Sequence, residues 1–325
     1  MNEPERKDDG EWERDVLNRL AFASLNEQRR TRRWGIFFKG LSFAFVLLVF
    51  FSVVLPGAGV GTDKPTGPHV AVVNVDGVIS GDSVASADAV VGALRSAMEN
   101  RDSRGVILRV NSPGGSPVQA GYIFDEMMRL REEYPEKPLH AVITDVGASG
   151  GYYIAAGAEN IYANRSSVVG SIGVTLNPFS PLSFGFHEAL ENMGIERRLI
   201  TSGDSKALLD PFMPAREDQV AHMQGVLDEM HTQFIDAVRA GRGERLNGDE
   251  AELFSGLIWT GERGLELGLV DGLASTSQVA REVFEQERLV DYTRRPSPLE
   301  RFVERLGVAL ARGVGQVFGA SNFAY

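Results

Sequence analysis

The chain has 325 residues with no cysteine, a hydrophobic content of 43% and a formal charge of −11. The lack of cysteine excludes disulfides, thiolate zinc sites and cysteine nucleophiles, and the excess of acidic over basic side chains argues against a nucleic-acid partner. This length and composition are enough for one large domain, or two small ones, with appendages.

An apolar segment near the N-terminus predicts a membrane anchor. Ile36–Leu55 reads IFFKGLSFAFVLLVFFSVVL, in which Lys39 is the only charge, and about 20 apolar residues are enough to cross a bilayer. A buried soluble helix would not be so apolar on every face, and a cleaved signal peptide would start nearer the N-terminus. The sequence therefore predicts a transmembrane helix over residues 35–55 and a linker, rich in glycine and proline, over residues 56–68.

The charges that flank this segment predict its orientation. Four arginines at positions 29, 30, 32 and 33 precede it, whereas only Lys64 soon follows it. Because basic residues stay on the cytoplasmic side, residues 1–34 are expected in the cytoplasm and the rest of the chain outside. Apolar residues recur at helical spacing between Trp12 and Leu25, which suggests an amphipathic helix on the membrane or on a partner.

From residue 69 onward, apolar β-branched runs alternate with helical patterns, as is typical of an α/β domain with parallel crossovers. The predicted strands are His69–Ile79, Gly105–Val110 and Leu139–Asp145, with shorter runs near Asn160–Ala163 and Glu196–Thr201. The predicted helices are Val84–Asn100, Pro117–Tyr134 and Ala215–Ala240. We expect this domain to cover residues 69–290, and residues 291–325 to form an amphipathic helix and a tail after the capping box at Ser297.

A G-x-S-x-G motif carries the first candidate for chemistry. In Gly147-Ala-Ser149-Gly-Gly151 the pattern places a hydroxyl on a tight turn at the start of a helix. An inert turn of the same composition is common. The histidines after Ser149 make a Ser–Asp–His order formally available, but their contexts argue against it, and none has metal-ligand spacing. Lys206 is therefore the preferred general base.

A glycine pair after the second strand is the candidate oxyanion hole. In the run NSPGGSP, Ser116 can cap the next helix and Pro117 can take its first position. Backbone N–H groups next to a helix start suit a developing oxyanion, and either Gly114 or Gly115 could act with the N–H of Gly150. An ordinary tight βα loop is the alternative.

Five motifs in this order resemble the bacterial signal peptide peptidases of the SppA type. The resemblance covers roughly Val70 to Leu273. The motifs are Asn111–Gly115, Ala148–Ala156, Val169–Val174, Gly203–Phe212 and Gly256–Asp271.

The resemblance implies a fold, a mechanism and an assembly. It implies a ClpP/crotonase-like α/β fold of repeated β-β-α/βα units, with the transmembrane helix added, and no cofactor or metal. It implies that Ser149 is the nucleophile, Lys206 the general base, Gly114 an oxyanion-hole donor with Gly150, and Ser171 a hydrogen-bond partner of the lysine amine. The family also implies a homo-oligomeric ring or dome at the bacterial inner membrane, in which one subunit's lysine can reach the next subunit's serine.

The chemistry of the candidate base and the predicted location of the domain reduce the possible functions to three. A lysine is normally charged at neutral pH, so an apolar wall such as the one after Lys206 must keep it neutral before it can accept a proton. The residues alone indicate a hydrolase tethered to the membrane, and the resemblance implies its substrate, so the leading hypothesis is a membrane-bound serine endopeptidase that degrades cleaved signal peptides. A catalytically idle oligomeric scaffold is the second, and acyl-CoA chemistry, which needs carboxylates and a cytoplasmic substrate, is the third.

Overall fold

The computed structural model describes residues 29–48, 67–176 and 185–294, which belong to two units, Met1–Lys64 and Pro65–Tyr325. In the first unit the described residues form one N-terminal helix, residues 29–48, with exposed side chains throughout. Within the described residues, no helix combines the length and the apolar character needed to span a bilayer. The last seven residues of the predicted span, 49–55, lie outside the described residues, as do the predicted amphipathic helices near both chain ends.

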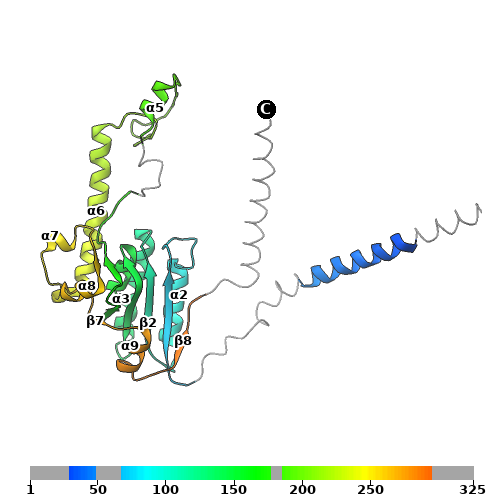
Figure 1. The fold of residues 1–325 in the computed structure, drawn as a ribbon, viewed down its shortest axis with the longest axis vertical. Coiled ribbons are helices and arrows are strands. Elements are labelled where there is room, and N and C mark those ends of the chain that lie inside the picture. Colours follow the sequence, from blue (N-terminus) through cyan, green and yellow to red (C-terminus); the bar gives the residue numbers. More distant parts are fainter. Residues whose placement is uncertain (1–28, 49–66, 177–184, 295–325) are drawn as a thin grey trace, which may run out of the picture. The chain divides into compact units, whose positions relative to one another are not determined.

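The second unit is built on one eight-stranded sheet (Figure 1). The strand order is β6-β5-β3-β2-β1-β8, and β4 pairs with β3 and β7. All pairs are parallel except β5 with β6. The strands are β1 (His69–Asp76), β2 (Ser103–Ser112), β3 (Leu139–Ala148), β4 (Ile161–Ala163), β5 (Val168–Gly170), β6 (Ile258–Thr260), β7 (Gly272–Leu273) and β8 (Leu289–Asp291).

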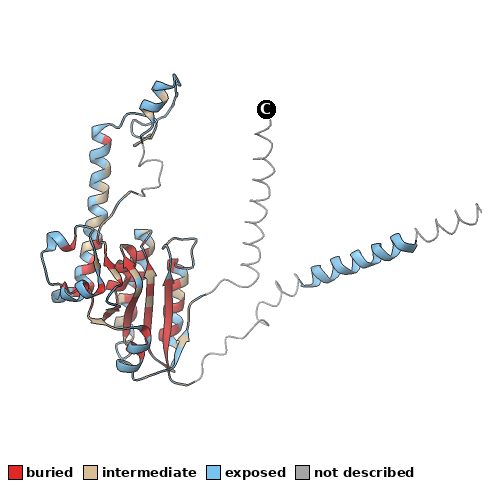
Figure 2. Cartoon of the chain, in the orientation of Figure 1, coloured by how far each residue is buried: buried red, intermediate tan, exposed pale blue. Residues whose placement is uncertain are grey.

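The central strands are buried on both faces, because helices cover each side of the sheet (Figure 2). On one face, alternate residues such as Val73 and Leu108 join the main apolar core. On the other face, Val70, Ile107 and Val142 pack against α9. This accounts for the continuous apolar runs in the sequence, since a strand with two covered faces has no polar alternation. The predicted α/β class is confirmed.

The helices match the sequence patterns closely. The three longest predicted helices appear as α2 (Ala87–Glu99), α3 (Pro117–Glu133) and α6 (Glu217–Arg242). Ser116 caps α3 by accepting the Gln119 N–H at 3.4 Å. The shorter elements are α4 (Gly150–Ala156), α5 (His187–Asn192), η2 (Gly243–Arg245), α7 (Glu250–Leu253), α8 (Gly261–Glu266) and α9 (Thr276–Glu282).

The strand predicted over Glu196–Thr201 is wrong. These residues are exposed and form no strand or helix. They lie between α5 and α6, in a segment where the Phe186 and Phe212 rings pack at a tilt, with a centroid distance of 5.6 Å, and Arg197 pairs with Asp210. The apolar run that suggested a strand finds no neighbouring strand there, so its backbone cannot join a ladder.

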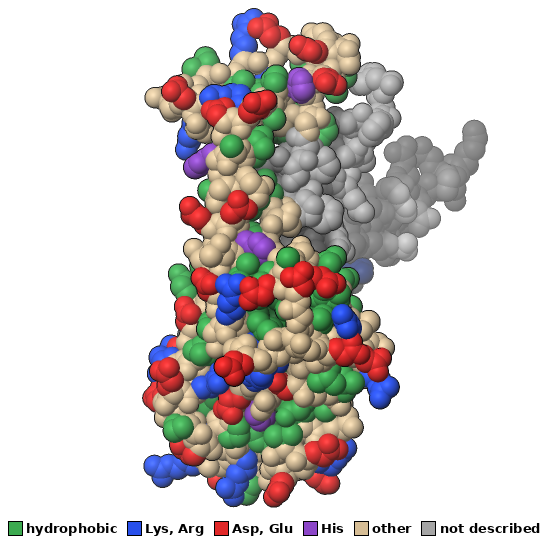
Figure 3. All heavy atoms as spheres, turned by 90° about the vertical axis from the view of Figure 1, so that its left-hand side faces the viewer, with side chains coloured by type: hydrophobic (Ala, Val, Ile, Leu, Met, Phe, Trp, Pro, Cys, Tyr) green, Lys and Arg blue, Asp and Glu red, His purple; other side chains and the backbone are tan. Residues whose placement is uncertain are grey.

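A peripheral lobe, which we call the arm, consists of residues 185–216 and the first half of α6 (Figure 1). The second half of α6 packs on α4 through Phe234, whose ring stacks on Tyr153 at 4.8 Å. Large apolar side chains remain exposed on the arm (Figure 3), and Ile200 is 95% exposed. The sheet therefore contains a dry core, whereas the arm buries little of its own apolar surface.

A buried ion pair fixes the inner end of α6. The Arg242 side chain is fully buried and donates to both carboxylate oxygens of Asp271, at 2.7 and 2.9 Å, and to the Gly268 carbonyl. Burial raises the pKa of Asp271, but the hydrogen bonds and charge of Arg242 outweigh this and hold the pKa below its usual value. Asp271 also accepts the Ile161 N–H at 2.7 Å, so the pair ties α6 to the sheet.

Candidate active site

Ser149 lies at the end of β3, at the N-cap of α4, in a strained backbone conformation. Its φ is 52° and its ψ −125°, a region that residues other than glycine rarely occupy and that is typical of functional sites. The side chain makes no capping hydrogen bond and is half-buried. α4 packs closely on β2, and this packing requires glycine at position 151, because a Cβ there would lie 2.7 Å from the Ser112 carbonyl oxygen. The hydroxyl is therefore held at a sharp strand-to-helix turn, accessible and unused by the helix.

Ser171 lies beside Ser149 because their strands are paired. Ala148 of β3 is in register with Gly170 of β5, and the Ser149 N–H donates to the Gly170 carbonyl at 2.9 Å. Ser171 also has a positive φ, 54°, and donates its own N–H to the Leu257 carbonyl at 2.7 Å. Two hydroxyl-bearing residues thus follow two adjacent parallel strands at the same edge of the sheet.

The glycine loop contacts the serine turn directly. Gly114 has a φ of 104°, and a Cβ there would lie 2.8 Å from both the Ser149 Cβ and the Gly150 nitrogen. The Gly114 N–H donates to the Ser112 hydroxyl at 3.1 Å. Among the described residues, the N–H groups of Gly115 and Gly150 have no acceptor, and a Cβ on Gly150 would lie 3.3 Å from the Gly115 nitrogen. Unpaired donors therefore converge next to the serine.

Lys206 lies on the arm, away from this cluster. It is exposed, and its side chain makes no hydrogen bond or ion pair with any described residue. Leu209, three residues on, donates its N–H to the Gln219 side chain near the outer end of α6. Gln219 precedes Phe234, which packs on α4, by 15 helical residues, so about 22 Å of helix separates the two positions. The structure brings Ser149, Gly114, Gly150 and Ser171 together and leaves Lys206 apart.

Asp210, four residues beyond Lys206, has a different partner for its carboxylate. It pairs with Arg197, and this hydrogen bond lowers the pKa of Asp210. The Asp210 carboxylate is thus paired within the arm with a residue other than Lys206.

Two side chains that the sequence analysis did not select also approach the site. The His231 Nε2 lies 3.1 Å from the Ile172 carbonyl oxygen, directly after Ser171. The Trp259 indole lies against Gly170, and its buried nitrogen has no partner among the described residues. Neither spacing nor motif predicts these contacts, because both depend on how α6 and β6 pack over β5.

Comparisons with known proteins identify the family. The model of peptidase family S49 matches residues 131–290. A Synechocystis protein whose name describes it as a protease is 32% identical to this chain over 217 residues. These residues are 67% of this chain and 73% of that protein. The chain belongs to peptidase family S49. The S49 relatives include a signal peptide peptidase SppA of Enterococcus faecium, 29% identical over 62% of this chain and 56% of that protein. The resemblance to the SppA type is confirmed.

A Brucella abortus protein named for the Na(+)/H(+) antiporter NhaA is also similar, with 40% identity over 193 residues. These residues are 59% of this chain but only 25% of that protein, so the chain spans about a quarter of this relative's length. The matched family and the relatives from Synechocystis and Enterococcus faecium are named for peptidases. The mixed α/β sheet fits the ClpP/crotonase-like fold that the resemblance implies.

Proposed function

We propose that this chain is a membrane-bound serine endopeptidase that degrades cleaved signal peptides, with Ser149 as nucleophile and Lys206 as general base. The observation that carries the proposal is the strained turn at Ser149, whose hydroxyl has no partner among the described residues and lies beside the unpaired N–H groups of Gly115 and Gly150. Strain of this kind persists only where the surrounding structure holds it. A peptide carbonyl carbon near the Ser149 Oγ would have its oxygen within reach of those donors.

The reaction follows from these groups. The Ser149 oxygen attacks the carbonyl carbon while its proton passes to the neutral Lys206 amine. The N–H of Gly150 stabilises the negative oxygen together with a second donor. This second donor is the N–H of Gly115, or that of Gly114 once it has released the Ser112 hydroxyl. The lysine then returns the proton to the leaving amine, which breaks the peptide bond and leaves an acyl-serine. Water, deprotonated by the same lysine, hydrolyses the ester and restores the hydroxyl. Ser171 is proposed to orient the amine.

We infer that the base comes from a neighbouring subunit. In a single chain Lys206 is exposed on the arm, apart from Ser149, and a general base must lie within hydrogen-bond reach of the proton that it accepts. A second copy that covers the apolar side chains of the arm would also desolvate the amine and favour its neutral form. We therefore propose a homo-oligomeric ring or dome, with the N-terminus cytoplasmic, the arginine-flanked apolar segment in the inner membrane and the peptidase domain outside.

Mixing two inactive variants tests both the dyad and its arrangement. Full-length Ser149→Ala and Lys206→Ala proteins in detergent should each lose at least about a thousandfold in kcat on an apolar signal-peptide substrate. Co-assembled from denaturant in equal amounts, they should regain activity at about one quarter of the interfaces, those that combine an intact serine with a neighbour's intact lysine.

The alternative reading, an idle scaffold, predicts a different outcome. The separation of Ser149 from Lys206 within one chain favours it. Wild-type protein that assembles but cleaves no peptide would support the scaffold. If the single variants remained active, the dyad would be refuted. If both variants were inactive and their mixture formed mixed oligomers but stayed inactive, the site shared between subunits would be refuted. Lys206→Arg is the matched control: it keeps the charge and length but cannot serve as base.

A further inference from the structure

The N-terminal helix, residues 29–48, carries a cluster of arginines that have no acidic partner among the described residues. Arg29, Arg30, Arg32 and Arg33 are exposed, and the helix contains no Asp or Glu. None of the four makes an ion pair with any described residue. Four guanidinium groups on about one and a half helical turns repel one another unless anions lie between them, so this part of the helix is complementary to a dense array of negative charge.

Three aromatic rings follow the arginines directly. Trp34 stacks on Phe38 with a centroid distance of 5.7 Å and an interplanar angle of 28°, and Phe37 meets Trp34 edge-on at 5.8 Å. The three side chains are between 52% and 56% exposed. Arg30, Trp34 and Phe38 recur every four residues, which places a cation and two rings on one face of the helix.

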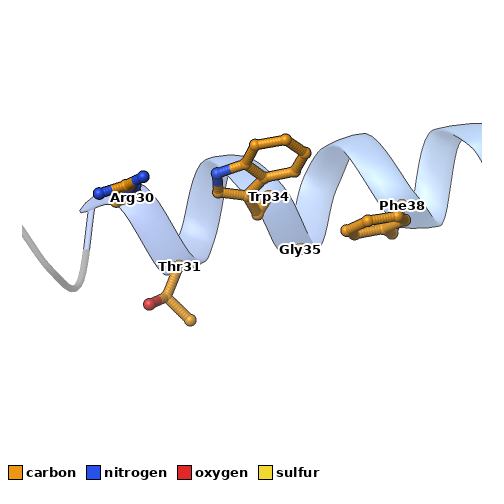
Figure 4. A pocket seen from close by; sticks show the side chains of 5 residues that line it. All are labelled: Arg30, Thr31, Trp34, Gly35 and Phe38. Atoms are coloured by element: carbon orange, nitrogen blue, oxygen red, sulfur yellow. The ribbon is translucent and has the colours of Figure 1, made fainter.

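A shallow hollow lies on this face (Figure 4). Arg30, Thr31, Trp34, Gly35 and Phe38 line it. The hollow is open beside Gly35, since a Cβ added at that position would meet nothing within 4 Å. The hollow therefore has a cationic and hydroxyl end at Arg30 and Thr31 and an aromatic end at Phe38.

We propose that residues 29–38 form a binding site for anionic phospholipid, with the phosphate on the arginines and the glycerol and upper acyl chains against the Trp34 and Phe38 rings. Nucleic acid or an acidic protein would satisfy the arginines but not the largely apolar surface from Trp34 to Leu48, in which Lys39 is the only charge. A bilayer offers phosphates and hydrocarbon in this order. The inference rests on the membrane location proposed above and adds a preference for lipid charge.

The chain's lack of cysteine makes the site easy to probe. A bimane label on Thr31→Cys of the full-length protein, in nanodiscs that contain brominated lipid, reports lipid at the hollow, and the same label on Ser42→Cys reports lipid further along the helix. Brominated phosphatidylglycerol should quench the Thr31 label more strongly than brominated phosphatidylcholine, and the Ser42 label should show a smaller difference. Changing all four arginines to Gln should lower the preference for phosphatidylglycerol at least about fivefold, the contribution of a single arginine, whereas changing them to Lys should retain most of it.

The outcomes separate this inference from the proposed location. Equal quenching of the Thr31 label by both lipids, or a preference that survives the change to Gln, would overturn the lipid site while leaving the membrane location intact. If neither lipid quenched the label at either position, the membrane location itself would be contradicted. If inorganic phosphate at millimolar concentration abolished the preference, the arginines would bind soluble phosphate and the lipid assignment would fail.

Discussion

The sheet edge that carries Ser149 and the arm that carries Lys206 differ in almost every physical respect. The serine follows a strand buried on both faces, and both its backbone N–H and its carbonyl form hydrogen bonds of 2.9 Å. The lysine is in an exposed turn whose neighbours pair mainly with one another. One chain therefore pre-organises the nucleophile and the oxyanion donors, but leaves the base in a setting that needs another surface to complete it.

Hydrogen exchange should show this contrast most strongly. We expect the amides of β2 to open only with global unfolding, whereas those of residues 196–201, which are exposed and outside helices and strands, need no opening. We expect β2 to exchange at least about a thousandfold more slowly. Mass spectrometry of the full-length protein at two concentrations checks this. Protection of the arm should rise where oligomers form, and equal protection of both regions in dilute monomer would remove the basis of the comparison.

Gly114→Ala tests how closely the glycine loop is matched to the serine. The new Cβ would lie 2.8 Å from the Ser149 Cβ, at a φ of 104° that alanine avoids. Peptidase kcat should fall about a hundredfold or more, comparable to the loss of an oxyanion donor. Gly92→Ala on α2, where a Cβ meets nothing within 4 Å, is the matched control and should keep full activity with slightly raised stability. Wild-type kcat in a folded Gly114→Ala protein would contradict the proposed site.

Arg242→Met tests what anchors the inner end of α6. Removing the buried guanidinium leaves the half-buried Asp271 carboxylate with only the longer, 3.4 Å contact to Arg245, which should lower the free energy of unfolding by about 3 kcal/mol. Urea denaturation measures the change. Arg239→Met, one turn earlier on the same helix, breaks the exposed pair with Glu250 and should cost less than about 1 kcal/mol. Similar losses in the two variants would show that burial does not distinguish these pairs.

His140 predicts a smaller effect, confined to acid conditions. It is 3% exposed on β3, between the rings of Tyr162 and Phe284, and desolvation lowers its pKa. The unfolded chain therefore binds the proton more readily, so stability is fully present above pH ~6.5 and falls as the pH drops below it. Urea midpoints between pH 7.5 and 5 should show this loss, and His140→Phe should reduce it. The same change at the exposed His222 should not, and an unaltered pH dependence in His140→Phe would refute the assignment.

Much of the sheet was predictable because each central strand carries a local signal. Val, Ile and Leu runs mark β1 to β3, and the Ser-Pro and Ser-Gly-Gly sequences mark the starts of α3 and α4. The adjacency of Ser149, Gly114, Gly150 and Ser171 could also be anticipated, since residues that follow parallel strands gather at one edge of the sheet. Their roles, and that of Lys206, stay predictions.

The sequence by itself determined the residue types available for chemistry, the α/β class and the order of the long helices, because turn, cap and burial signals act over a few neighbouring residues. Only the tertiary structure decided that Glu196–Thr201 forms no strand, that His231 and Trp259 lie against β5, and that α6 carries Lys206 away from its own Ser149. These results depend on contacts between residues far apart in the chain, and a local pattern does not encode which surface an element will meet.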